Sequence, residues 1–488
     1  MRKTSMKVNA IFNAIRTLIN ILFPLVTFKY ISQVLLTDNI GKVNFSNSVI
    51  SYFTLIADFG IATYAVREGA KYRSNKQRFE EFASDIFSLN IFTMILSYIL
   101  LIFLISIYEK LDVYKWILII QSGSLMFNVI GATWINTIYE DYKSILYRSL
   151  FVQIISLILL FAFVRDQNDY YQYAMVSVLA QSGVNIINSI YIRKYCRLKV
   201  RFSKKMLHYI PALCILMGIS ITTTVYVNSD ITMIGLFRGD SEVAYYSVAV
   251  KIYNVIKAIL AAIIIVGIPR LTELYFSKDY DRYRELSLKS LNVLLTFMLP
   301  IIAGVFLLSE EAVLLVSGVQ YLDSVVTLKI LCIAVAFAVL ATYITDIIIL
   351  PQGIEKGALY AAALSAVMNI VLNLIMIPQY GFNGAAITTV ISEAFVCIIS
   401  IIYVYFKDKK NLRFILNKEI GRNLIKSMIG IAIFYLISNY IIKCFEIGVI
   451  RCVVIIGLSV ILYIISMIIM KQDVIMEILK KLVVIIKK

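Results

Sequence analysis

The sequence predicts an all-α protein that crosses a membrane about fourteen times, with both termini in the cytoplasm. Of its 488 residues 60% are hydrophobic and only 16% are charged, whereas a soluble domain is about 45–50% apolar and about 25% charged. A soluble particle of this size has no interior large enough for so many apolar side chains. We therefore exclude a soluble enzyme and a disordered chain. We also expect no nucleic-acid partner, although the net charge is +17.

Fourteen apolar runs are long enough to cross a bilayer, because a spanning helix needs about 20 mostly apolar residues. The runs are continuous rather than alternating, which argues against a transmembrane barrel. The predicted spans are 10–32, 43–66, 86–108, 116–138, 144–164, 170–192, 211–236, 243–268, 288–308, 324–350, 358–378, 381–406, 422–442 and 447–469.

The distribution of basic residues predicts the orientation of these spans. With both termini inside, 35 of the 47 lysines and arginines fall in inside segments or at the inner ends of spans (Arg148, Lys289, Arg422 and Lys426), six in outside loops and six elsewhere within spans. Basic residues are retained on the cytoplasmic side, so this asymmetry supports a cytoplasmic location for both termini. It also explains the net charge through membrane orientation and attraction to anionic lipid.

The sequence offers no catalytic or metal site. Every predicted outside loop is short, and the longest, 309–323, leaves no room for a catalytic domain. The six cysteines are scattered and His208 is the only histidine, so we expect no metal and no bound cofactor. Arg16 interrupts the first apolar run, and we expect no cleavable signal peptide.

Two segments 200 residues apart indicate an internal repeat. The first segment begins at Gly41 and reads GKVNFSNSVISYF, and the second begins at Ser241 and reads SEVAYYSVAVKIYNV. They match at Val43 and Val243, at Phe45 and Tyr245, and at Asn47 and Ser247. Parallel repeats of this kind usually enclose a central site. The predicted organisation is an N-terminal lobe at 1–192, a basic linker at 193–208, a C-terminal lobe at 209–406, two further spans within 407–470, and a tail at 471–488. Lysines and apolar residues are interspersed in the tail. This pattern predicts either an amphipathic helix on the inner membrane surface or a frayed chain end.

Polar residues form stripes on four spans of these lobes. In the first span they recur at i, i+3, i+4 and i+7, which puts them on one helix face. Polar groups in lipid face a cavity or a partner, so the stripes predict a hydrated, cationic cavity. Its predicted lining is Asn13, Arg16, Thr17, Asn20, Lys29, Asn47, Ser51, Thr224, Asn228, Ser247, Lys251, Asn254 and Lys257.

Besides Asp346 near a span end, three acidic residues lie within the spans, and each is a candidate for an ion pair between helices or for a coupling-ion site. Asp58 lies at the depth of Arg16, and Asp230 at the depth of Lys251, so each is a candidate for an ion pair between helices. Glu393 lies near the middle of its span as a candidate for a coupling-ion site, or for a hydrogen bond to a neighbouring helix.

At several positions the sequence resembles the polysaccharide-transporter branch of the multidrug/oligosaccharidyl-lipid/polysaccharide (MOP) flippase superfamily, which also holds the multidrug and toxin extrusion proteins. One departure is Gln33, where the family often has an arginine. The residues that carry the resemblance are Pro24, Ile40-Gly41-Lys42-Val43-Asn44-Phe45, Tyr52-Phe53, Gly60-Ile61, Tyr64, Arg67-Glu68, Trp134, Glu140-Asp141-Tyr142-Lys143, Arg148-Ser149, Asp230, Gly235, Tyr245-Tyr246, Ala249, Lys251, Pro269-Arg270, Gly381, Gly384-Ala385-Ala386 and Glu393.

This resemblance implies a flippase of the bacterial plasma membrane. Its substrate would be an undecaprenyl-diphosphate-linked oligosaccharide repeat unit, moved from the inner to the outer leaflet by alternating access for O-antigen, capsule or teichoic-type polymers. H⁺ or Na⁺ is the implied coupling ion. The implied partners are the lipid-linked oligosaccharide, membrane lipid, and the polysaccharide polymerase with other assembly proteins.

Two other functions remain open at this point. A cation-coupled multidrug and toxin extrusion antiporter should have a more acidic and aromatic cavity, whereas the four striped spans hold four bases against two acids. A membrane-embedded polysaccharide polymerase or glycosyltransferase should have a sizeable outer loop with catalytic acids.

Overall fold

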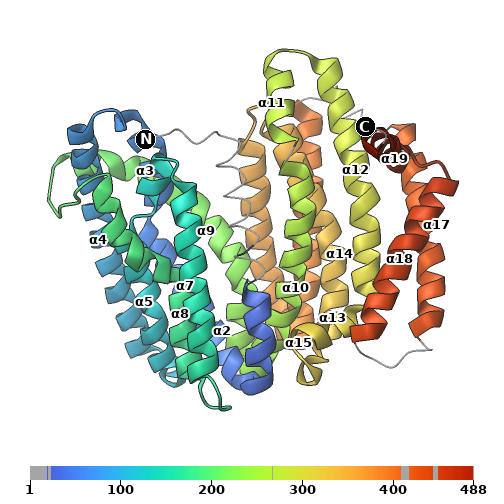
Figure 1. Cartoon of the computed structure of the whole chain (residues 1–488). Coiled ribbons are helices and arrows are strands. Elements are labelled where there is room, and N and C mark those ends of the chain that lie inside the picture. Colours follow the sequence, from blue (N-terminus) through green and yellow to red (C-terminus); the bar gives the residue numbers. More distant parts are fainter. Residues whose placement is uncertain (1–18, 20–22, 266, 408–416, 443–448, 487–488) are drawn as a thin grey trace. The chain divides into compact units, whose positions relative to one another are not determined.

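The computed structural model of the chain describes residue 19 and residues 23–265, 267–407, 417–442 and 449–486 (Figure 1). Within these ranges the secondary structure is helical, without strands. The chain divides into two compact units, Met1–Ala244 and Tyr245–Lys488, and each is described by itself. The lobe boundaries expected from the sequence, with a linker at 193–208, stay a prediction.

The first unit is built from long helices joined by short helical turns. Its elements are α2 (Thr37–Asp58), α3 (Ile61–Gly69), η1 (Ala70–Tyr72), α4 (Lys76–Ile107), η2 (Glu109–Tyr114), α5 (Lys115–Gly131), α6 (Trp134–Ile138), α7 (Tyr142–Phe163), α8 (Tyr170–Tyr191), η3 (Ile192–Lys194) and α9 (Lys205–Phe237). Residues 23–34 are also helical.

The second unit continues α10, whose first turn belongs to the first unit. Its elements are α10 (Asp240–Ile265), α11 (Ile268–Phe276), α12 (Tyr280–Leu307), α13 (Ser309–Val316), η4 (Val319–Tyr321), α14 (Ser324–Tyr343), the π-helix η5 (Ile344–Ile349), α15 (Lys356–Lys407), α17 (Lys418–Ile442), α18 (Val449–Ile469) and α19 (Asp473–Ile486).

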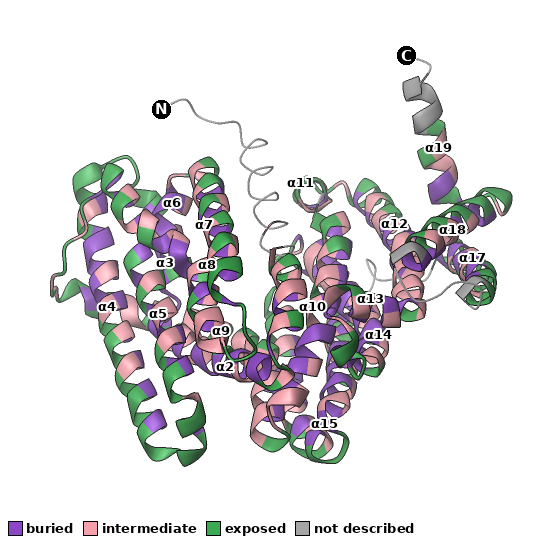
Figure 2. Ribbon diagram, turned by 60° about the horizontal axis from the view of Figure 1, so that its bottom comes forward, coloured by how far each residue is buried: buried purple, intermediate pink, exposed green. Residues whose placement is uncertain are grey.

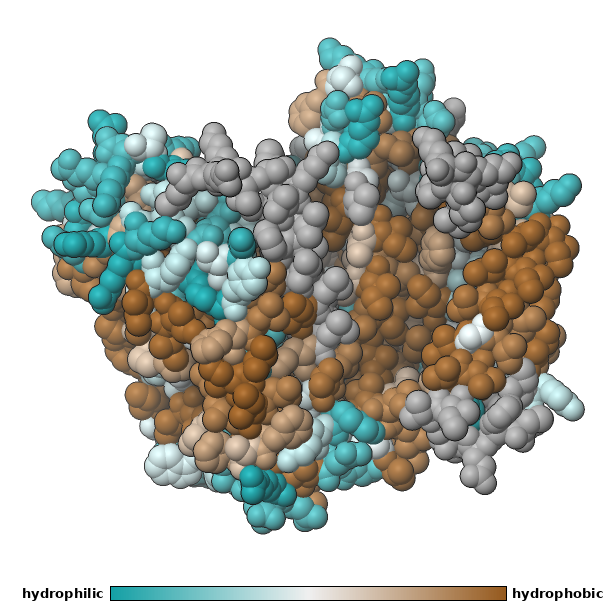
Figure 3. All heavy atoms as spheres, in the orientation of Figure 1, coloured by the Kyte–Doolittle hydropathy of each residue, from teal (hydrophilic) through white to brown (hydrophobic). Residues whose placement is uncertain are grey.

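Twelve helical stretches of the described chain are long and apolar enough to cross a membrane. Eleven of them overlap one predicted span each, and α15 covers two. The predicted span 10–32 lies largely outside the described residues, so the count of fourteen stays a prediction, as does the cytoplasmic location of the termini. Multi-pass membrane insertion is nevertheless clear from these helices. In the first unit, Figure 3 shows a hydrophobic band across the middle of the helices with hydrophilic residues at their ends.

The outward faces of these helices are themselves apolar. Figure 2 shows buried and exposed patches alternating along α4 and α5. On α4 the exposed positions include Phe92, Ile99 and Phe103, each about 60% exposed (59%, 58% and 62%). A protein in water rarely exposes a continuous apolar face of this size. These faces are therefore the surface that contacts lipid.

The second predicted span is broken near one end. Phe59 and Gly60 both adopt left-handed backbone (φ 47° and 73°), which ends α2 and starts α3 in a new direction. The carbonyl of Ala57 at the break accepts hydrogen bonds from the side chains of Asn90 and Thr93 on α4, both at 2.7 Å. The Ala57 carbonyl at the break thus accepts hydrogen bonds from within the protein. It needs them because the membrane interior offers no water to satisfy it.

Helix α15 is a helical hairpin rather than one rod. A straight helix of its 52 residues would extend about 78 Å, far beyond a hydrocarbon core of about 30 Å. Gly381, three residues after Pro378, has non-helical backbone (φ 59°, ψ −144°) and reverses the chain. The two arms are tied together where the Ser365 hydroxyl donates to the Ser392 carbonyl at 2.9 Å.

The C-terminal helices pack on α12. The Tyr463 hydroxyl of α18 donates to the Thr296 carbonyl at 2.8 Å, and Gln472 donates to the hydroxyl of Thr296 at 2.9 Å. Lys289 of α12 then pairs with Glu477 of α19 at 2.5 Å. The tail therefore forms a helix over residues 473–486 that is held to α12 by these bonds.

The glycine that follows the α15 reversal offers a test of this close packing. A Cβ at Gly384 would lie 2.4 Å from the Met376 carbonyl oxygen, which belongs to the backbone of the other arm. We expect Gly384→Ala to lower the free energy of unfolding by about 1–3 kcal/mol, the range typical of overpacking. Thermal unfolding in detergent measures the effect.

The matched control is Gly304→Ala in α12, where a Cβ would meet no atom within 4 Å. That variant should be unchanged or slightly stabilised, because alanine favours helix over glycine. Equal thermal stability of the two variants would contradict the close approach at Gly384.

Candidate functional site

The predicted stripe on α2 lies on an accessible face. Asn47 is exposed, and Ser51 and Asp58 are half-buried. Their spacing of four and seven residues keeps them on one side of the helix. The Ser51 hydroxyl donates within its own helix, to the Ser48 carbonyl at 2.6 Å. This face is therefore only partly covered by neighbouring helices.

A neighbouring face of α2 packs against α9 through hydroxyl groups. Thr232 lies 2.9 Å from the Ser48 hydroxyl and 3.1 Å from the Tyr52 hydroxyl, oxygen to oxygen. Thr232 is absent from the lining that the sequence predicts. A usable signal existed, since Thr224, Asn228 and Thr232 are spaced by four residues and share one face.

The stripe on α9 is half-buried at Thr224 and Asn228. The Asn228 amide donates to the Thr224 carbonyl at 3.0 Å, and Thr232 donates to the Asn228 carbonyl at 3.0 Å. Asp230, the acidic candidate of this span, is buried at 6% exposure. Two residues on from Asn228, it points to a different side of the helix.

Helix α10 carries the basic part of the predicted lining. Ser247 is buried, Lys251 is half-buried, and Asn254 is exposed. The Lys257 side chain is one-third exposed. Lys29, from the helical residues 23–34, is half-buried as well. Asn13, Arg16, Thr17 and Asn20 lie outside the described residues.

Glu393 of α15 meets α10 in the second unit. Its Oε1 accepts from the Tyr253 hydroxyl at 2.9 Å and from Lys257 Nζ at 3.1 Å. The glutamate side chain is only 6% exposed. A buried carboxylate is tolerated when a cation and a hydroxyl satisfy it in this way. Of the two interpretations of Glu393, this geometry matches the hydrogen bond to a neighbouring helix, here α10. Glu393 and Lys257, both predicted site residues, also form an ion pair with each other.

A second polar network lies where α7 begins. Asp141 caps α7, and the hydroxyls of Tyr191 and Tyr195 donate to its Oδ2 at 2.7 and 2.6 Å. Burial raises the pKa of Asp141, but the hydrogen bonds from Tyr195, Ser144 and Tyr191 outweigh it and lower the pKa overall. Arg148 lies over the Tyr191 ring, 4.0 Å from its centroid. The network joins α7 to α8 and its C-terminal turn.

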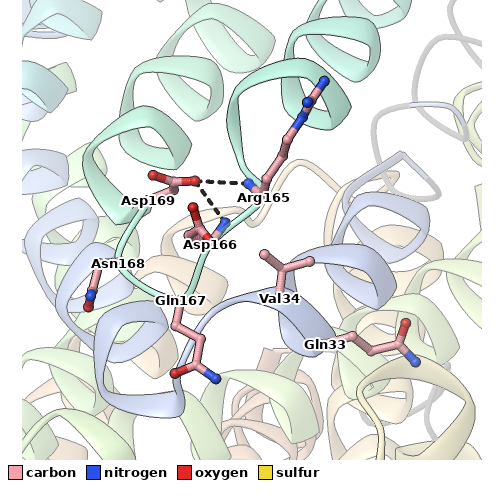
Figure 4. Close-up of a pocket in the computed structure, with 7 residues that line it drawn as sticks. All are labelled: Gln33, Val34, Arg165, Asp166, Gln167, Asn168 and Asp169. Atoms are coloured by element: carbon pink, nitrogen blue, oxygen red, sulfur yellow. Dashed lines mark hydrogen bonds between the residues drawn. The ribbon is translucent and has the colours of Figure 1, made fainter.

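A polar pocket of about 730 Å³ opens beside the loop between α7 and α8 (Figure 4). Gln33 and Val34 line one side of it, and residues 165–169 line the other. Asp169 accepts the backbone N–H groups of Arg165 and Asp166 at 2.9 and 2.8 Å, and these bonds lower its pKa. The loop is thus ordered by its own aspartate. Gln33, the departure from the family pattern, is a wall of this pocket.

The Glu393 cluster leads to a stability prediction. Glu393→Gln removes the charge that pairs with Lys257, and we expect a loss of about 1–3 kcal/mol in unfolding free energy. Glu273→Gln is the control, because its pair with Arg270 is exposed on both sides (66% and 57%). An exposed pair contributes about 0–1 kcal/mol. Similar thermal unfolding of both variants in detergent would exclude a structural role for the buried pair.

The Asp141 network leads to a pH prediction. Because its folded-state pKa is lowered, the ionised group stabilises the fold above its unfolded pKa of about 3.9. This contribution is lost as the pH falls through the folded-state pKa. The stability difference between the wild type and Asp141→Asn should therefore shrink between pH 6 and pH 3. A difference that stays constant across this range would refute the assignment.

Comparison with known sequences agrees with this architecture. Residues 6–275, more than half of the chain, match a family model described as polysaccharide biosynthesis protein. A Shigella dysenteriae protein named as an O-antigen transporter is 21% identical over 384 residues, which cover 77% of this chain and 94% of that protein. A Haloferax volcanii protein named as a low-salt glycan biosynthesis flippase is 23% identical over 167 residues, covering 34% of this chain and 35% of that protein.

Solved structures share the fold at low sequence identity. The lipid II flippase MurJ in an inward closed conformation aligns with a TM-score of 0.76 and 18% identity, over 96% of this chain and all of MurJ. A multidrug resistance MATE family transporter of the MOP superfamily aligns with a TM-score of 0.63 and 13% identity, over 80% of this chain and 95% of that one. The chain therefore belongs to the polysaccharide biosynthesis protein family and is a multi-pass membrane protein that shares its fold with MurJ and with that MATE family transporter.

Proposed function

We propose that this protein is a flippase for undecaprenyl-diphosphate-linked oligosaccharide repeat units. It moves them from the inner to the outer leaflet of the plasma membrane for the synthesis of a cell-surface polysaccharide. The observation that carries the proposal is the similarity to a protein named as an O-antigen transporter, which extends over 94% of that relative. The MurJ-like fold and the polar faces of α2, α9 and α10 support it.

The chemistry of this substrate explains why the spans carry polar stripes. An oligosaccharide headgroup loses its water when it enters a membrane, and each unpaired polar group costs free energy. Amide and hydroxyl side chains replace that water. Asn47 and Asn254 are exposed on α2 and α10, and we assign them, with Ser51 and Thr224, to the sugar headgroup.

The diphosphate needs positive charge. In our proposal Arg16, Lys29, Lys251 and Lys257 offset its negative charge through charge-assisted hydrogen bonds. Lys257 pairs with Glu393 at 3.1 Å. It can therefore bind the diphosphate only if this ion pair opens while the substrate passes. The same opening gives Glu393 a means of taking up a coupling ion, H⁺ or Na⁺, and Asp58 is the second candidate for that role.

Transport in this proposal proceeds by alternating access, with the headgroup in the protein and the polyprenyl tail in the lipid. A negative cell interior favours outward movement of an anion by about 2.3 kcal/mol per charge per 100 mV. The membrane potential thus supplies a driving force of useful size for a diphosphate. Ion coupling adds to it.

A cation-coupled antiporter of the multidrug and toxin extrusion type is the second candidate function, because such a transporter has the same fold. Fold alone does not distinguish the two, whereas the family model and the named relatives favour the polysaccharide branch. A polymerase or glycosyltransferase is less well supported, because the relatives are named as transporters and a flippase.

A leaflet-resolved assay tests the proposed function. The purified protein in proteoliposomes should flip a fluorescent undecaprenyl-diphosphate oligosaccharide, measured by chemical quenching of the outer leaflet. We expect Lys251→Gln and Arg16→Gln each to lower the initial rate about tenfold. A charge-assisted bond is worth roughly 1.5–3 kcal/mol, and about 1.4 kcal/mol corresponds to tenfold in rate.

Lys115→Gln is the matched control, because Lys115 is exposed at the start of α5 and belongs to no stripe. It should flip at the wild-type rate. Undiminished flipping by Lys251→Gln and Arg16→Gln would rule out the cationic lining. Proton-driven uptake of a cationic dye without any flipping would instead support the antiporter.

A further inference from the structure

Residues 197–203, which we call the strap, run along α4 without regular secondary structure before α9 begins. Alternate backbone amides of the strap donate to α4 side chains spaced by four residues. These bonds are Arg197 N to Glu80 Oε1 at 3.2 Å, Lys199 N to Ser84 Oγ at 3.2 Å and Arg201 N to Ser88 Oγ at 2.9 Å. The strap is therefore a fixed surface feature.

An ion pair fixes the end of the strap. Arg201 Nε donates to Asp85 Oδ1 at 2.7 Å, and Arg201 Nη2 donates to the Glu81 carbonyl at 2.7 Å. The Asp85 side chain is 2% exposed and the Arg201 side chain 36% exposed. Because the arginine faces α4, the residues on either side of it face away from α4.

The register against α4 gives the depth of the strap in the membrane. From Arg197 to Arg201 its partners advance from Glu80 to Ser88, a rise of about 12 Å along a helix. The apolar run of α4 begins near residue 86. The strap therefore starts at the polar end of α4 and finishes at the level where the hydrocarbon core begins.

Large apolar side chains are exposed at that level. Phe202 is 87% exposed, Val200 is 60% exposed, and Leu207 in the first turns of α9 is 68% exposed. Such exposure is unfavourable in water and favourable among acyl chains. Lys199, Lys204 and Lys205 are exposed beside them, and residues 192–208 contain no acid. Apolar side chains at this level with exposed lysines beside them fit an anionic lipid.

We propose that the strap and the start of α9 form a binding site for an anionic phospholipid of the membrane. Phe202, Val200 and Leu207 lie among its acyl chains, and the three lysines hold its phosphate. An acidic protein partner fits less well, because the apolar side chains lie at hydrocarbon depth. This inference does not rest on the transport activity proposed above.

The test measures phospholipid binding to the full-length protein in detergent by native mass spectrometry. Phosphatidylglycerol should bind at least about fivefold more tightly than phosphatidylcholine, because each lysine near an anionic lipid surface contributes about fivefold in affinity. Lys204→Gln/Lys205→Gln should abolish that preference. The control, Lys110→Gln/Lys115→Gln, removes two exposed charges from the opposite end of the unit and should keep it.

A second variant separates the built site from simple charge attraction. Asp85→Asn makes the protein more positive, so non-specific attraction predicts tighter phosphatidylglycerol binding. A site positioned by the Arg201–Asp85 pair predicts about several-fold weaker binding instead. Phe202→Ser, which removes the acyl contact at an exposed position, should also weaken binding without unfolding the protein.

Three outcomes would overturn the proposal. They are equal binding of the two phospholipids, an unchanged preference in Lys204→Gln/Lys205→Gln, and tighter binding in Asp85→Asn. In a competition at equal concentration, displacement of phosphatidylglycerol by undecaprenyl diphosphate would assign the site to the transported lipid and also overturn it. Flipping rates of the same variants are measured separately, so the two proposals succeed or fail independently.

Discussion

The bilayer offers no water to an exposed peptide group, and this constraint governs how the described helices are built. Every place where a helix breaks must supply a donor from the protein. Asn90 and Thr93 serve the Ala57 carbonyl at the end of α2. The Asn188 amide serves the Gly131 carbonyl at the end of α5, at 2.6 Å. The Tyr283 hydroxyl serves the Ile347 carbonyl in the π-helix η5, at 2.9 Å. The polar residues that make the breaks possible thus lie on the neighbouring helix.

This constraint separates two kinds of polar residue within the spans. One kind is buried and donates to a carbonyl of another helix, as Ser97 does to Phe53 at 2.7 Å and Gln121 does to Val43 at 3.0 Å. The other kind, such as Asn47 and Asn254, is exposed. Residues of the first kind hold the helices together, and their loss should reduce stability. The second kind presents accessible side-chain groups, and Asn47 and Asn254 of the proposed lining belong to it.

The sequence predicts the spans well because a bilayer demands long apolar runs, and such runs are visible without an alignment. It does not predict the break after Asp58, because Phe59 and Gly60 continue an apolar run and only their left-handed backbone ends the helix. It predicts which residues share a helix face, since that depends on local period alone. It does not predict that Lys257 and Glu393, 136 residues apart, would meet. Pairing depends on which helices become neighbours, and one sequence carries no local trace of that.

The ion pairs also change how the basic residues of the spans should be counted. Arg451 of α18 pairs with Glu311 of α13, and both side chains are buried at 9% and 2% exposure. Lys257 pairs with Glu393 in a similar way. A buried charge that loses its partner is strongly destabilising, so each such acid fixes its base in the fold.

In each of these pairs the acid and the base come from different helices. A count of bases and acids over the four striped spans alone omits Glu393, and it therefore overstates the positive charge that is free to meet an anion. The cationic character of a transport path must therefore be judged from pairs in the structure, and a base that keeps its acid can serve an anion only by releasing it. In the proposed function, that exchange would couple the binding of an anionic substrate to the contact between α10 and α15.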